Sequence, residues 1–388
     1  MKTSKKGTVV IAMYTHVEGY PPSLNAIQQL SKSFDFLVVV HRNTMANTWH
    51  FPTNVQLTTT GQFASYDEVS KKSGVWKIVS FIKFVSLFHR TLKLNSPDLI
   101  IIHEPIALLA WGIICKFYRK RHHVWYHNHD VILGNESFLF KLSHRMQNSI
   151  FSSLDIFSLP ANERKEFFPI EKLSGKYFYV PNYPGTYLYN NYYQPRKIEK
   201  QIRILFQGKI AAGHCIEQIV HLMSDKKFSI DLMLVLKGFK DENYFKELMT
   251  LAKDLGVDER IVYYEVGSYQ SVPEVTSTCH IGIGIHTKTD VMNRTLGSAS
   301  NKIYEYAALG LPVLLFDNSH FKMHLGKYKW AFFTNGEAEN IKEIILKIRE
   351  QYEQTSLAAR KDFLSHLNFE TCFEPALKYA SFLVFEGN

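Results

Sequence analysis

Short runs of purely apolar residues, separated by segments with helical periodicity, constrain the fold of this chain more than any other feature. Thr8–Met13 and Phe36–Val40 are two such runs, and the pattern of Ser23–Ser31 between them predicts a helix. Apolar runs without polar alternation are typical of strands in parallel sheets, which helices cover on both faces. Further strands are expected at Leu99–Ile102, Val124–Tyr126, Asp155–Leu159 and Phe178–Val180, with a helix near Ile106–Phe117.

The same alternation begins again after a polar segment in the middle of the chain. Residues from Asn182 to Lys197 are rich in Tyr and Asn and are interrupted by prolines, which is typical of a linker. Strands are then expected at Ile202–Gln207, Leu232–Leu236, Ile261–Tyr264, Ile281–Ile285 and Val313–Phe316. Helices between them are expected at Glu217–Met223, Asp241–Leu255, Val272–Ser277 and Asn301–Leu309.

The length of 388 residues exceeds what one hydrophobic core usually supports, so we expect two domains. Each is predicted to be an α/β, Rossmann-like domain, and the two parallel sheets are predicted to face each other across a cleft. The expected boundaries are 1–184 for the N-terminal domain, 185–200 for the linker and 201–365 for the C-terminal domain. Residues 366–388 are expected to form a helical segment that packs back on the N-terminal domain.

The composition fits a cytoplasmic enzyme. Four cysteines lie far apart without a CxxC pair, a pattern that predicts neither a disulfide framework nor a zinc site. No signal-peptide pattern precedes Thr8, and no uncharged run reaches the roughly 20 residues of a membrane span. The formal net charge of +9 favours an anionic partner, but nucleic acid is not expected because no recognised binding module accompanies the charge.

The segment Ser300–Pro312 carries the clearest functional pattern. An apolar face at helical spacing, followed by Gly310, predicts a short helix that packs on a sheet. Asn301 and Glu305 share another face of this helix, where a carboxylate can accept two hydroxyls of a ribose. The preceding turn, Gly297–Ser300, offers N–H groups to an anion such as a diphosphate.

This segment resembles the nucleotide-sugar site of GT-B glycosyltransferases, particularly those of family 4. Their pattern is a Glu, seven residues and a second Glu. Glu305 matches the second, whereas the first falls on Gly297, and the chain looks like a branch with the form N-K-[LI]-x-E-Y. The resemblance implies the GT-B fold. It also implies a donor site made of Gly208, Lys209, Gly267, Ser268, Arg294, Ser298, Ala299, Ser300, Asn301, Lys302 and Glu305.

The start of the second domain agrees with the resemblance. Gly208 and Lys209 end its first strand and resemble the family's G-[RK]-[LI] turn, where Gly lets a diphosphate approach the backbone and Lys neutralises it. His214 takes the place of the family's next lysine. No D-x-D triplet occurs, so no metal is expected, and Lys209, Arg294 and the Gly297–Ser300 turn would stabilise the diphosphate.

The matches in the first domain are weaker and concern the acceptor side and catalysis. His129 and Asp130 match the family's H-[DE] after a strand and are the candidate catalytic residues, able to contact the sugar or transfer a proton. His127 stands at the same strand end, where the alternative to function is hydrogen bonding to neighbouring loops. The His103-Glu104-Pro105 segment also stands at a strand end, where the alternative is a role in starting a helix. Glu18, Gly19 and Tyr20 follow the first strand, where the family often has a glycine pair, and are expected on the acceptor side.

Val75–Lys93 is predicted to be a helix with two apolar faces. The core face is expected to hold Ile78, Phe81, Ile82, Val85, Phe88 and Leu92. The opposite face is expected to hold Trp76, Phe84 and Leu87, interleaved with Lys77, Lys83 and Arg90. Such a basic, aromatic face is typical of a helix at an anionic membrane surface, to which Arg119–Arg121 would add charge. The alternative is a core helix with lysines extended over it.

The resemblance implies a glycosyltransferase that uses a UDP- or GDP-sugar as co-substrate, without a cofactor or a metal, and retains the anomeric configuration. The acceptor would be a bacterial surface or lipid-linked glycan, reached from the cytoplasm or the inner face of the cytoplasmic membrane. Two alternatives remain. One is a GT-B sugar-nucleotide epimerase, which needs no acceptor. The other is a non-catalytic nucleotide-sugar-binding protein, which the absence of a Glu at position 297 would allow.

Overall fold

The chain forms two compact α/β units, each with one parallel sheet. The computed structural model describes residues 7–42, 49–61, 71–118, 122–131, 138–226, 228, 230–287 and 295–387. Met1–Pro181 together with Cys372–Asn388 make up the first unit, and Asn182–Thr371 make up the second. The predicted α/β class with two parallel sheets is confirmed.

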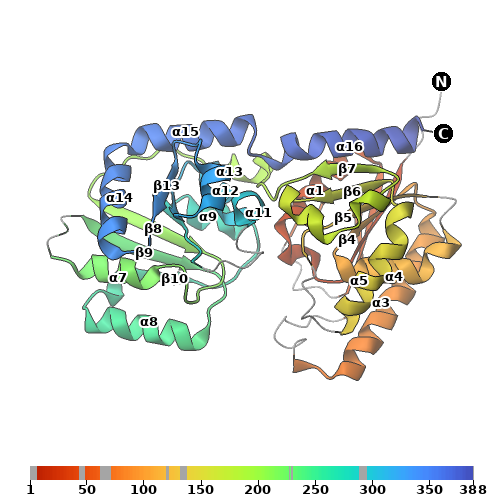
Figure 1. Ribbon diagram of the computed structural model, residues 1–388, viewed down its shortest axis with the longest axis horizontal. Coiled ribbons are helices and arrows are strands. Elements are labelled where there is room, and N and C mark those ends of the chain that lie inside the picture. Colours follow the sequence, from red (N-terminus) through yellow and green to blue (C-terminus); the bar gives the residue numbers. More distant parts are fainter. Residues whose placement is uncertain are drawn as a thin grey trace. The chain divides into compact units, whose positions relative to one another are not determined.

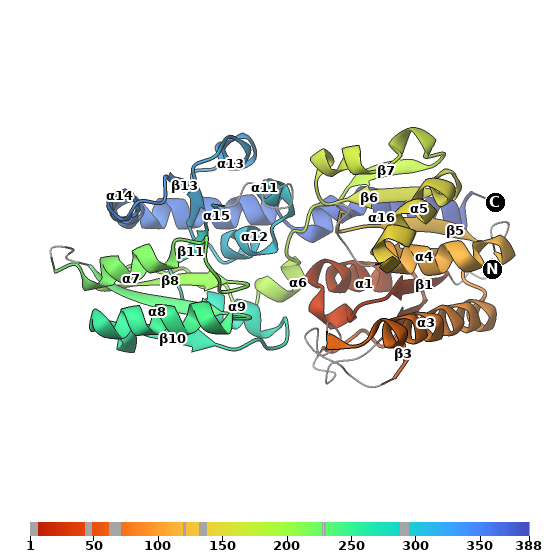
Figure 2. The same cartoon turned by 60° about the horizontal axis from the view of Figure 1, so that its bottom comes forward.

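The sheet of the first unit has seven parallel strands in the order β3-β2-β1-β4-β5-β6-β7. Figure 1 shows β4, β5, β6 and β7 lying next to one another in this order. Its strands are β1 (Thr8–Met13), β2 (Phe36–His41), β3 (Val55–Thr59), β4 (Leu99–His103), β5 (His123–His127), β6 (Ile156–Leu159) and β7 (Lys176–Tyr179). Its helices are α1 (Pro21–Ser33), α3 (Gly74–Asn95), α4 (Pro105–Ile114) and α5 (Phe138–Ile150). Figure 2 shows α3, α4 and α5 side by side along this sheet.

The sheet of the second unit has six parallel strands in the order β10-β9-β8-β11-β12-β13. Its strands are β8 (Gln201–Gln207), β9 (Asp231–Lys237), β10 (Ile261–Tyr264), β11 (Ile281–Gly284), β12 (Val313–Phe316) and β13 (Ala331–Thr334). Its helices are α6 (Thr186–Tyr189), α7 (Ile216–Ser224), α8 (Glu242–Asp254), α9 (Ser271–Thr276), α11 (Leu296–Ala299), α12 (Asn301–Ala308), α13 (Ser319–Leu325), α14 (Ala338–Glu350) and α15 (Tyr352–Ser365).

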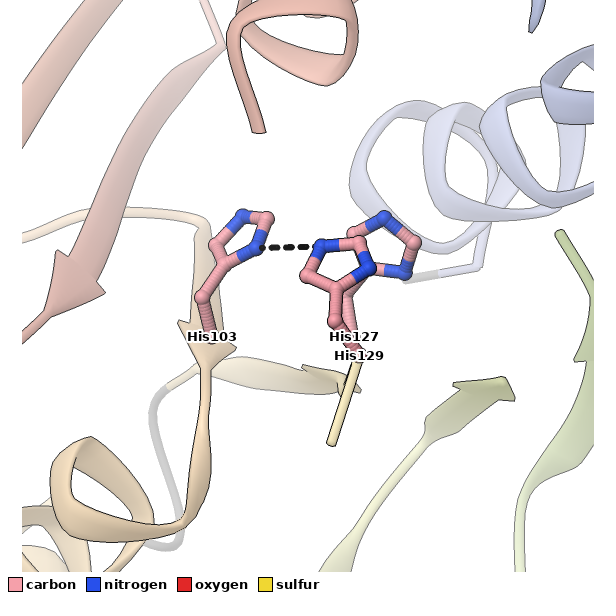
Figure 3. Close-up of side chains that lie close together, drawn as sticks. All are labelled: His103, His127 and His129. Carbon is pink, nitrogen blue, oxygen red and sulfur yellow. Dashed lines mark hydrogen bonds between the residues drawn. The ribbon is translucent and has the colours of Figure 1, made fainter. Parts of the chain in front are cut away.

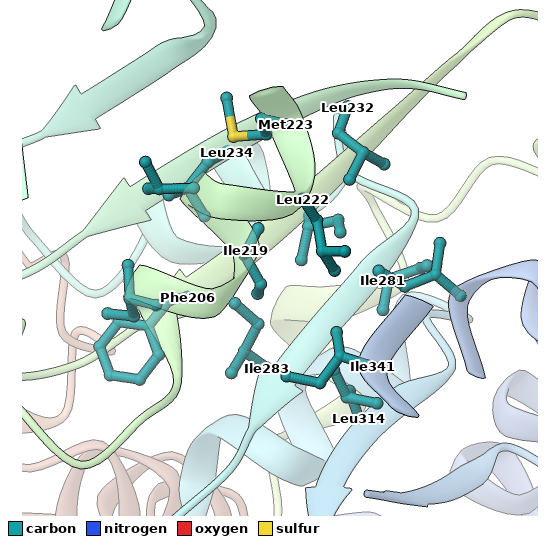
Figure 4. Packing of buried hydrophobic residues seen from close by; sticks show 14 of the residues in the cluster. Phe206, Ile219, Leu222, Met223, Leu232, Leu234, Ile281, Ile283, Leu314 and Ile341 are labelled. Carbon is teal, nitrogen blue, oxygen red and sulfur yellow. The ribbon is translucent and has the colours of Figure 1, made fainter. Parts of the chain in front are cut away.

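The core of the second unit lies between the sheet and the helices α7 and α14. Figure 4 shows Phe206 of β8 beside Ile219 of α7, with Ile283 of β11 and Ile341 of α14 closing the cluster. These side chains are fully buried, and each contributes about 1.5–3 kcal/mol relative to an exposed position. The core fixes the strands, whose carboxyl ends carry the polar residues described below.

The segment predicted to be a linker lies inside one of the compact units. Residues 185–200 belong to the second unit, where Tyr189 is fully buried and Glu370 accepts a hydrogen bond from the backbone N–H of Thr186 at 2.9 Å. The final helix, α16 (Phe369–Phe385), begins in the second unit and ends in the first. In the first unit, Phe373 stacks on Trp125 with ring centroids 5.2 Å apart.

The expected faces of α3 are wrong in part. Phe81, Phe88 and Leu92 are buried, as predicted, but Phe84, predicted to be outside, is fully buried as well. Ile78 and Ile82, predicted to face the core, are exposed instead. The error arises because the helix is apolar nearly all round, so its periodicity does not single out one face. Arg119–Arg121 lie outside the described residues. None of the described helices combines the length and the hydrophobicity that a membrane span requires.

Candidate functional site

Polar side chains gather at the carboxyl ends of β4 and β5 in the first unit. His103 ends β4 and pairs in register with His127, which ends β5. Beyond β5, the backbone N–H of Asn128 donates to the Ser158 carbonyl at 3.0 Å, and the Asn128 side chain donates to the Asp130 carbonyl. These bonds turn the chain so that His129 lies buried beside the strand ends. Carboxyl ends of parallel strands are where ligands of such sheets bind.

The two candidate catalytic residues are held by Tyr20 and Arg164. The Tyr20 hydroxyl donates to the Asp130 carboxylate at 2.5 Å, and the Tyr20 ring lies 5.9 Å from the His129 ring, centroid to centroid. Arg164 donates to the His129 carbonyl. Burial and the Asp130 charge raise the pKa of Tyr20 well above its usual value, so its hydroxyl keeps its proton. Of the three predicted acceptor-side residues, the structure thus brings Tyr20 to Asp130.

Glu18 and Gly19 lie on the 3-10 turn Val17–Gly19, just before α1. Gly19 is exposed, while Glu18 is partly buried. Glu18 and Gly19 directly precede Tyr20 in the chain, and it is Tyr20 that makes the contact to Asp130.

Three histidine rings meet at these strand ends (Figure 3). His103 Nδ1 lies 3.4 Å from His129 Nε2, and the His127 and His129 ring centroids are 4.5 Å apart. Burial, reinforced by the neighbouring rings, lowers the pKa of His103 and of His127 well below the usual value. Both rings are therefore neutral near pH 7 and carry lone pairs that can accept a hydrogen bond or bind a cation.

Glu104 also belongs to this cluster. From the sequence, both a functional role and a role in starting the next helix were open for it. It follows β4 with a backbone φ of 63°, which is strained for a residue with a side chain. Its carboxylate accepts hydrogen bonds from the Thr15 backbone N–H at 2.5 Å and the Thr15 hydroxyl at 3.0 Å. Burial raises its pKa to about 7. In the sequence, the feature that points to Glu104 is its position between a strand and Pro105.

In the second unit, two glycine turns at the ends of β8 and β9 pack directly on each other. Gly208 and Gly238 have φ values of 128° and 133°, in the region that favours glycine. A Cβ at Gly238 would lie 2.1 Å from the Gly208 carbonyl oxygen. The turn predicted at Gly208 is therefore present. Because its glycine carries no side chain, a diphosphate can approach the backbone closely.

The side chain of Lys302 lies beside this turn. The Lys302 ammonium lies 4.5 Å over the Phe206 ring, and a Cβ built on Gly208 would meet it at 3.7 Å. Lys209 is exposed. The His214 ring packs on the same Phe206, 4.6 Å between centroids. Burial lowers the pKa of Lys302, and the Glu305 charge opposes that shift.

Glu305 does not lie on an open face of α12, as the helical pattern had suggested. It is 1% exposed, and Gln207 at the end of β8 donates to its carboxylate. Burial raises its pKa, while contacts from Tyr269 and Gln207 and the Lys302 charge lower it in part. Gln207, which directly precedes Gly208 in the chain, thus connects Glu305 to the Gly208 turn.

The turn before α12 is compact. The Tyr304 hydroxyl donates to the Gly297 carbonyl, and the Ser298 hydroxyl donates to the Thr295 carbonyl at 3.3 Å. A Cβ at Gly297 would meet the His324 side chain at 3.0 Å, so an imidazole fills the space beside the position where the family has a Glu.

The remaining predicted donor residues lie at both ends of this region. Ala299 and Ser300 are buried, and Asn301 begins α12 partly exposed. Gly267 and Ser268 form the loop between β10 and α9, immediately before Tyr269. Arg294 lies outside the described residues. Within the described part of the predicted donor set, Lys302 lies beside Gly208, and Glu305 is linked to the same turn through Gln207.

Comparison with known proteins identifies the fold. No family model and no curated protein sequence matches this chain. Sucrose-phosphate synthase from Thermosynechococcus elongatus matches with a TM-score of 0.66 at 10% identity, over 96% of this chain and 98% of that one. Anabaena HepE in complex with UDP and glucose matches with a TM-score of 0.65 at 15% identity, over 96% and 99%. WaaG, a glycosyltransferase involved in lipopolysaccharide biosynthesis, matches with a TM-score of 0.63 at 12% identity, over 98% and 100%. The chain therefore has the predicted GT-B fold.

Proposed function

We propose that this protein is a glycosyltransferase that moves a sugar from a UDP- or GDP-sugar to an acceptor hydroxyl. The observation that carries the proposal is the joined set of Gly208, Lys302 and Glu305 in the second unit. It combines a glycine turn, a lysine beside it, and a buried carboxylate that is hydrogen-bonded to Gln207 at the start of that turn. A nucleoside diphosphate presents the complementary groups, namely a diphosphate and ribose hydroxyls. The GT-B fold, shared with HepE bound to UDP and glucose, supports this assignment.

In this proposal the second unit binds the donor. Lys302, assisted by the exposed Lys209, stabilises the diphosphate as it leaves, and the N–H groups at the start of α12 add to it. Glu305 accepts the ribose hydroxyls once Gln207 releases part of its carboxylate. The sequence has no D-x-D triplet, so in this proposal these groups, rather than a metal ion, meet the diphosphate charge. Retention of the anomeric configuration is proposed because the resemblance to family 4 implies it.

The first unit binds the acceptor in this proposal. His129 accepts a hydrogen bond from a sugar hydroxyl, and Asp130 is kept in place by the Tyr20 hydroxyl. Because the rings of His103 and His127 are neutral, the cluster presents lone pairs rather than positive charge to a hydroxylic ligand. This chemistry suits an uncharged sugar better than an anionic one.

The acceptor is proposed to be a surface or lipid-linked glycan, with α3 on the inner face of the cytoplasmic membrane. The start of α3 exposes Val75, Ile78, Val79 and Ile82 at 73%, 46%, 45% and 59%. Lys83 on the next turn is exposed as well. An apolar face beside basic residues is what an interfacial helix presents to anionic lipid.

Titration calorimetry with UDP, GDP and the free nucleosides tests the donor site. Lys302→Ala should weaken the nucleoside diphosphate more than the nucleoside, whereas Glu305→Gln should weaken both, each by about 1.5–3 kcal/mol. Lys253→Ala, an exposed lysine on α8, is the matched control and should change neither. Equal affinities for all variants would refute the donor site.

Turnover separates the proposal from its two alternatives. The protein is incubated with a panel of nucleotide sugars, with and without acceptor glycans, and the products are identified by mass spectrometry and NMR. Acceptor-dependent release of nucleoside diphosphate supports the transferase. An epimer formed without acceptor would instead identify an epimerase, and binding without any turnover would identify a non-catalytic protein.

Sedimentation with anionic vesicles tests the membrane contact. Ile78→Ser/Ile82→Ser should release the protein from vesicles at low salt, because it removes the exposed apolar face of α3. Leu364→Ser, at a 50% exposed position of α15 in the second unit, is the control. Wild-type protein that stays in solution would remove the membrane contact and leave the donor site in place.

A further inference from the structure

We propose that His103, His127 and His129 form a binding site for a divalent transition-metal ion of the zinc class. One ring nitrogen from each histidine lies within 4.8 Å of the others. His103 Nδ1 and His129 Nε2 are 3.4 Å apart. Two nitrogens bound to one tetrahedral zinc ion, at about 2.0 Å each, lie about 3.3 Å apart. The pair thus already has the spacing of two ligands of one ion, as Figure 3 shows.

The three rings are positioned by rigid elements. His103 and His127 end neighbouring strands β4 and β5, and His129 follows on the turn fixed by Asn128. All three rings are buried. Because the strand register sets the spacing, little conformational entropy is lost when an ion binds.

A second layer of hydrogen bonds orients His127. Its Nδ1 lies 2.7 Å from the Ser158 hydroxyl oxygen, which also accepts a hydrogen bond from the Trp125 indole at 2.8 Å. Metal-binding histidines commonly hold their other nitrogen in this way. The remaining nitrogen, His127 Nε2, is buried and has no hydrogen-bond partner among the residues that the structure describes. A metal ion would satisfy this atom.

Three protein ligands leave a fourth position on a tetrahedral ion, which water or a hydroxyl can occupy. The site is built from the first unit alone and does not depend on the donor function of the second. The four cysteines are far apart in the sequence and have no CxxC pair, so no cysteine motif signals this site. The histidines are brought together only by the strand order, in which β4 and β5 are neighbours.

Metal binding by untagged protein, stripped with a chelator and dialysed, tests the proposal. Wild-type protein should take up one equivalent of Zn²⁺ in competition with a chromophoric chelator, and Co²⁺ should give the intense visible bands of tetrahedral coordination. His103→Gln and His127→Gln should each lower zinc affinity at least about 100-fold, beyond the about 10- to 100-fold typical of losing an outer partner. Ser158→Ala should lower it about tenfold.

The matched control is His320→Gln/His324→Gln. These histidines stand one turn apart on α13 of the second unit, with ring centroids 4.5 Å apart, and form another close pair that could hold zinc. The control should retain the site. Zinc uptake lost in this control but kept in His103→Gln and His127→Gln would overturn the proposal.

X-ray absorption spectroscopy of zinc-loaded wild-type protein needs no variant and so does not depend on whether the variants fold. The proposal expects three imidazole ligands per zinc. Fewer than three, or no equimolar uptake at micromolar free Zn²⁺, would overturn it.

Discussion

Each unit buries one glutamate near the carboxyl ends of its strands, but the two surroundings differ. Glu104 follows β4 and is hydrogen-bonded by Thr15, while the nearby charge of Asp130 raises its pKa further. Glu305 on α12 receives a hydrogen bond from Gln207 and feels the positive charge of Lys302. Burial raises the pKa of both carboxyls to about 7, but a negative neighbour adds to the shift at Glu104, whereas a lysine opposes it at Glu305.

This difference shows what each sheet can bind. The first unit surrounds its strand ends with neutral histidines and a carboxyl of raised pKa, which suits hydroxyl groups or a metal ion. The second unit keeps a lysine and a carboxylate side by side next to a bare glycine turn, which suits a phosphate and a ribose. The same sheet architecture thus carries two electrostatic environments.

The largest effect expected from this comparison is in the second unit. Glu305→Ala should destabilise that unit by about 3 kcal/mol, because it leaves the Lys302 charge partly buried without its partner. The measurement is hydrogen exchange across α12, with chemical unfolding of the whole chain beside it. Lys302→Ala made in the Glu305→Ala background should recover part of the loss. A double variant as unstable as the sum of the single variants would show that the two charges do not interact.

The second prediction concerns pH and the first unit. The folded pKa of Glu104 is about 7 against an ordinary value of 4.5, so the folded state holds its proton more tightly. The stabilisation from this residue is complete below about pH 4.5 and is lost as the pH rises to about 7, by up to about 3 kcal/mol. Glu104→Gln stays neutral and should remove this loss, so that the variant is more stable than wild type at about pH 8.

Urea unfolding at about pH 5 and about pH 8 measures this difference. Glu171→Gln, an exposed carboxylate of the same unit, is the control and should keep the wild-type pH dependence. If Glu104→Gln loses stability between the two pH values as much as wild type does, the Glu104 carboxyl is not the cause.

The sequence predicted most of the fold because the inner strands are continuous apolar runs. Thr8–Met13 and Val313–Phe316 match β1 and β12 residue for residue. The strands that it missed, β3 and β13, lie at the edges of the sheets. Val55–Thr59 is partly exposed and contains polar residues, so it lacks the apolar signal of a strand buried on both faces.

The candidate sites were predictable only where one segment carries the chemistry. Lys302 and Glu305 stand in one recognisable stretch, so the sequence predicted both as donor-site residues. Glu104 and His103 depend on partners about 25 or 90 residues away in the chain, as the contacts of His103 with His129 and of Glu104 with Thr15 show. Such contacts follow from strand order and register, which one sequence does not reveal. The buried state of Glu305 was missed because Tyr189 and Tyr269 come from distant segments.

The smallest expected effect compares two glycines that follow strands in the two units. Gly61 after β3 and Gly238 after β9 have nearly the same backbone, with φ of 135° and 133°. A Cβ at Gly61 would meet nothing within 4 Å, whereas a Cβ at Gly238 would meet the Gly208 carbonyl at 2.1 Å. Alanine at either position therefore strains the backbone equally, but only Gly238→Ala adds a clash with a neighbouring turn.

We expect Gly238→Ala to cost about 1–3 kcal/mol more in unfolding free energy than Gly61→Ala. It should also weaken nucleoside diphosphate binding, because it displaces the Gly208 turn, while Gly61→Ala should leave that binding unchanged. Equal losses of stability for the two variants would mean that the turns of β8 and β9 can separate at little cost, and the close packing that sets the donor site apart would have no energetic weight.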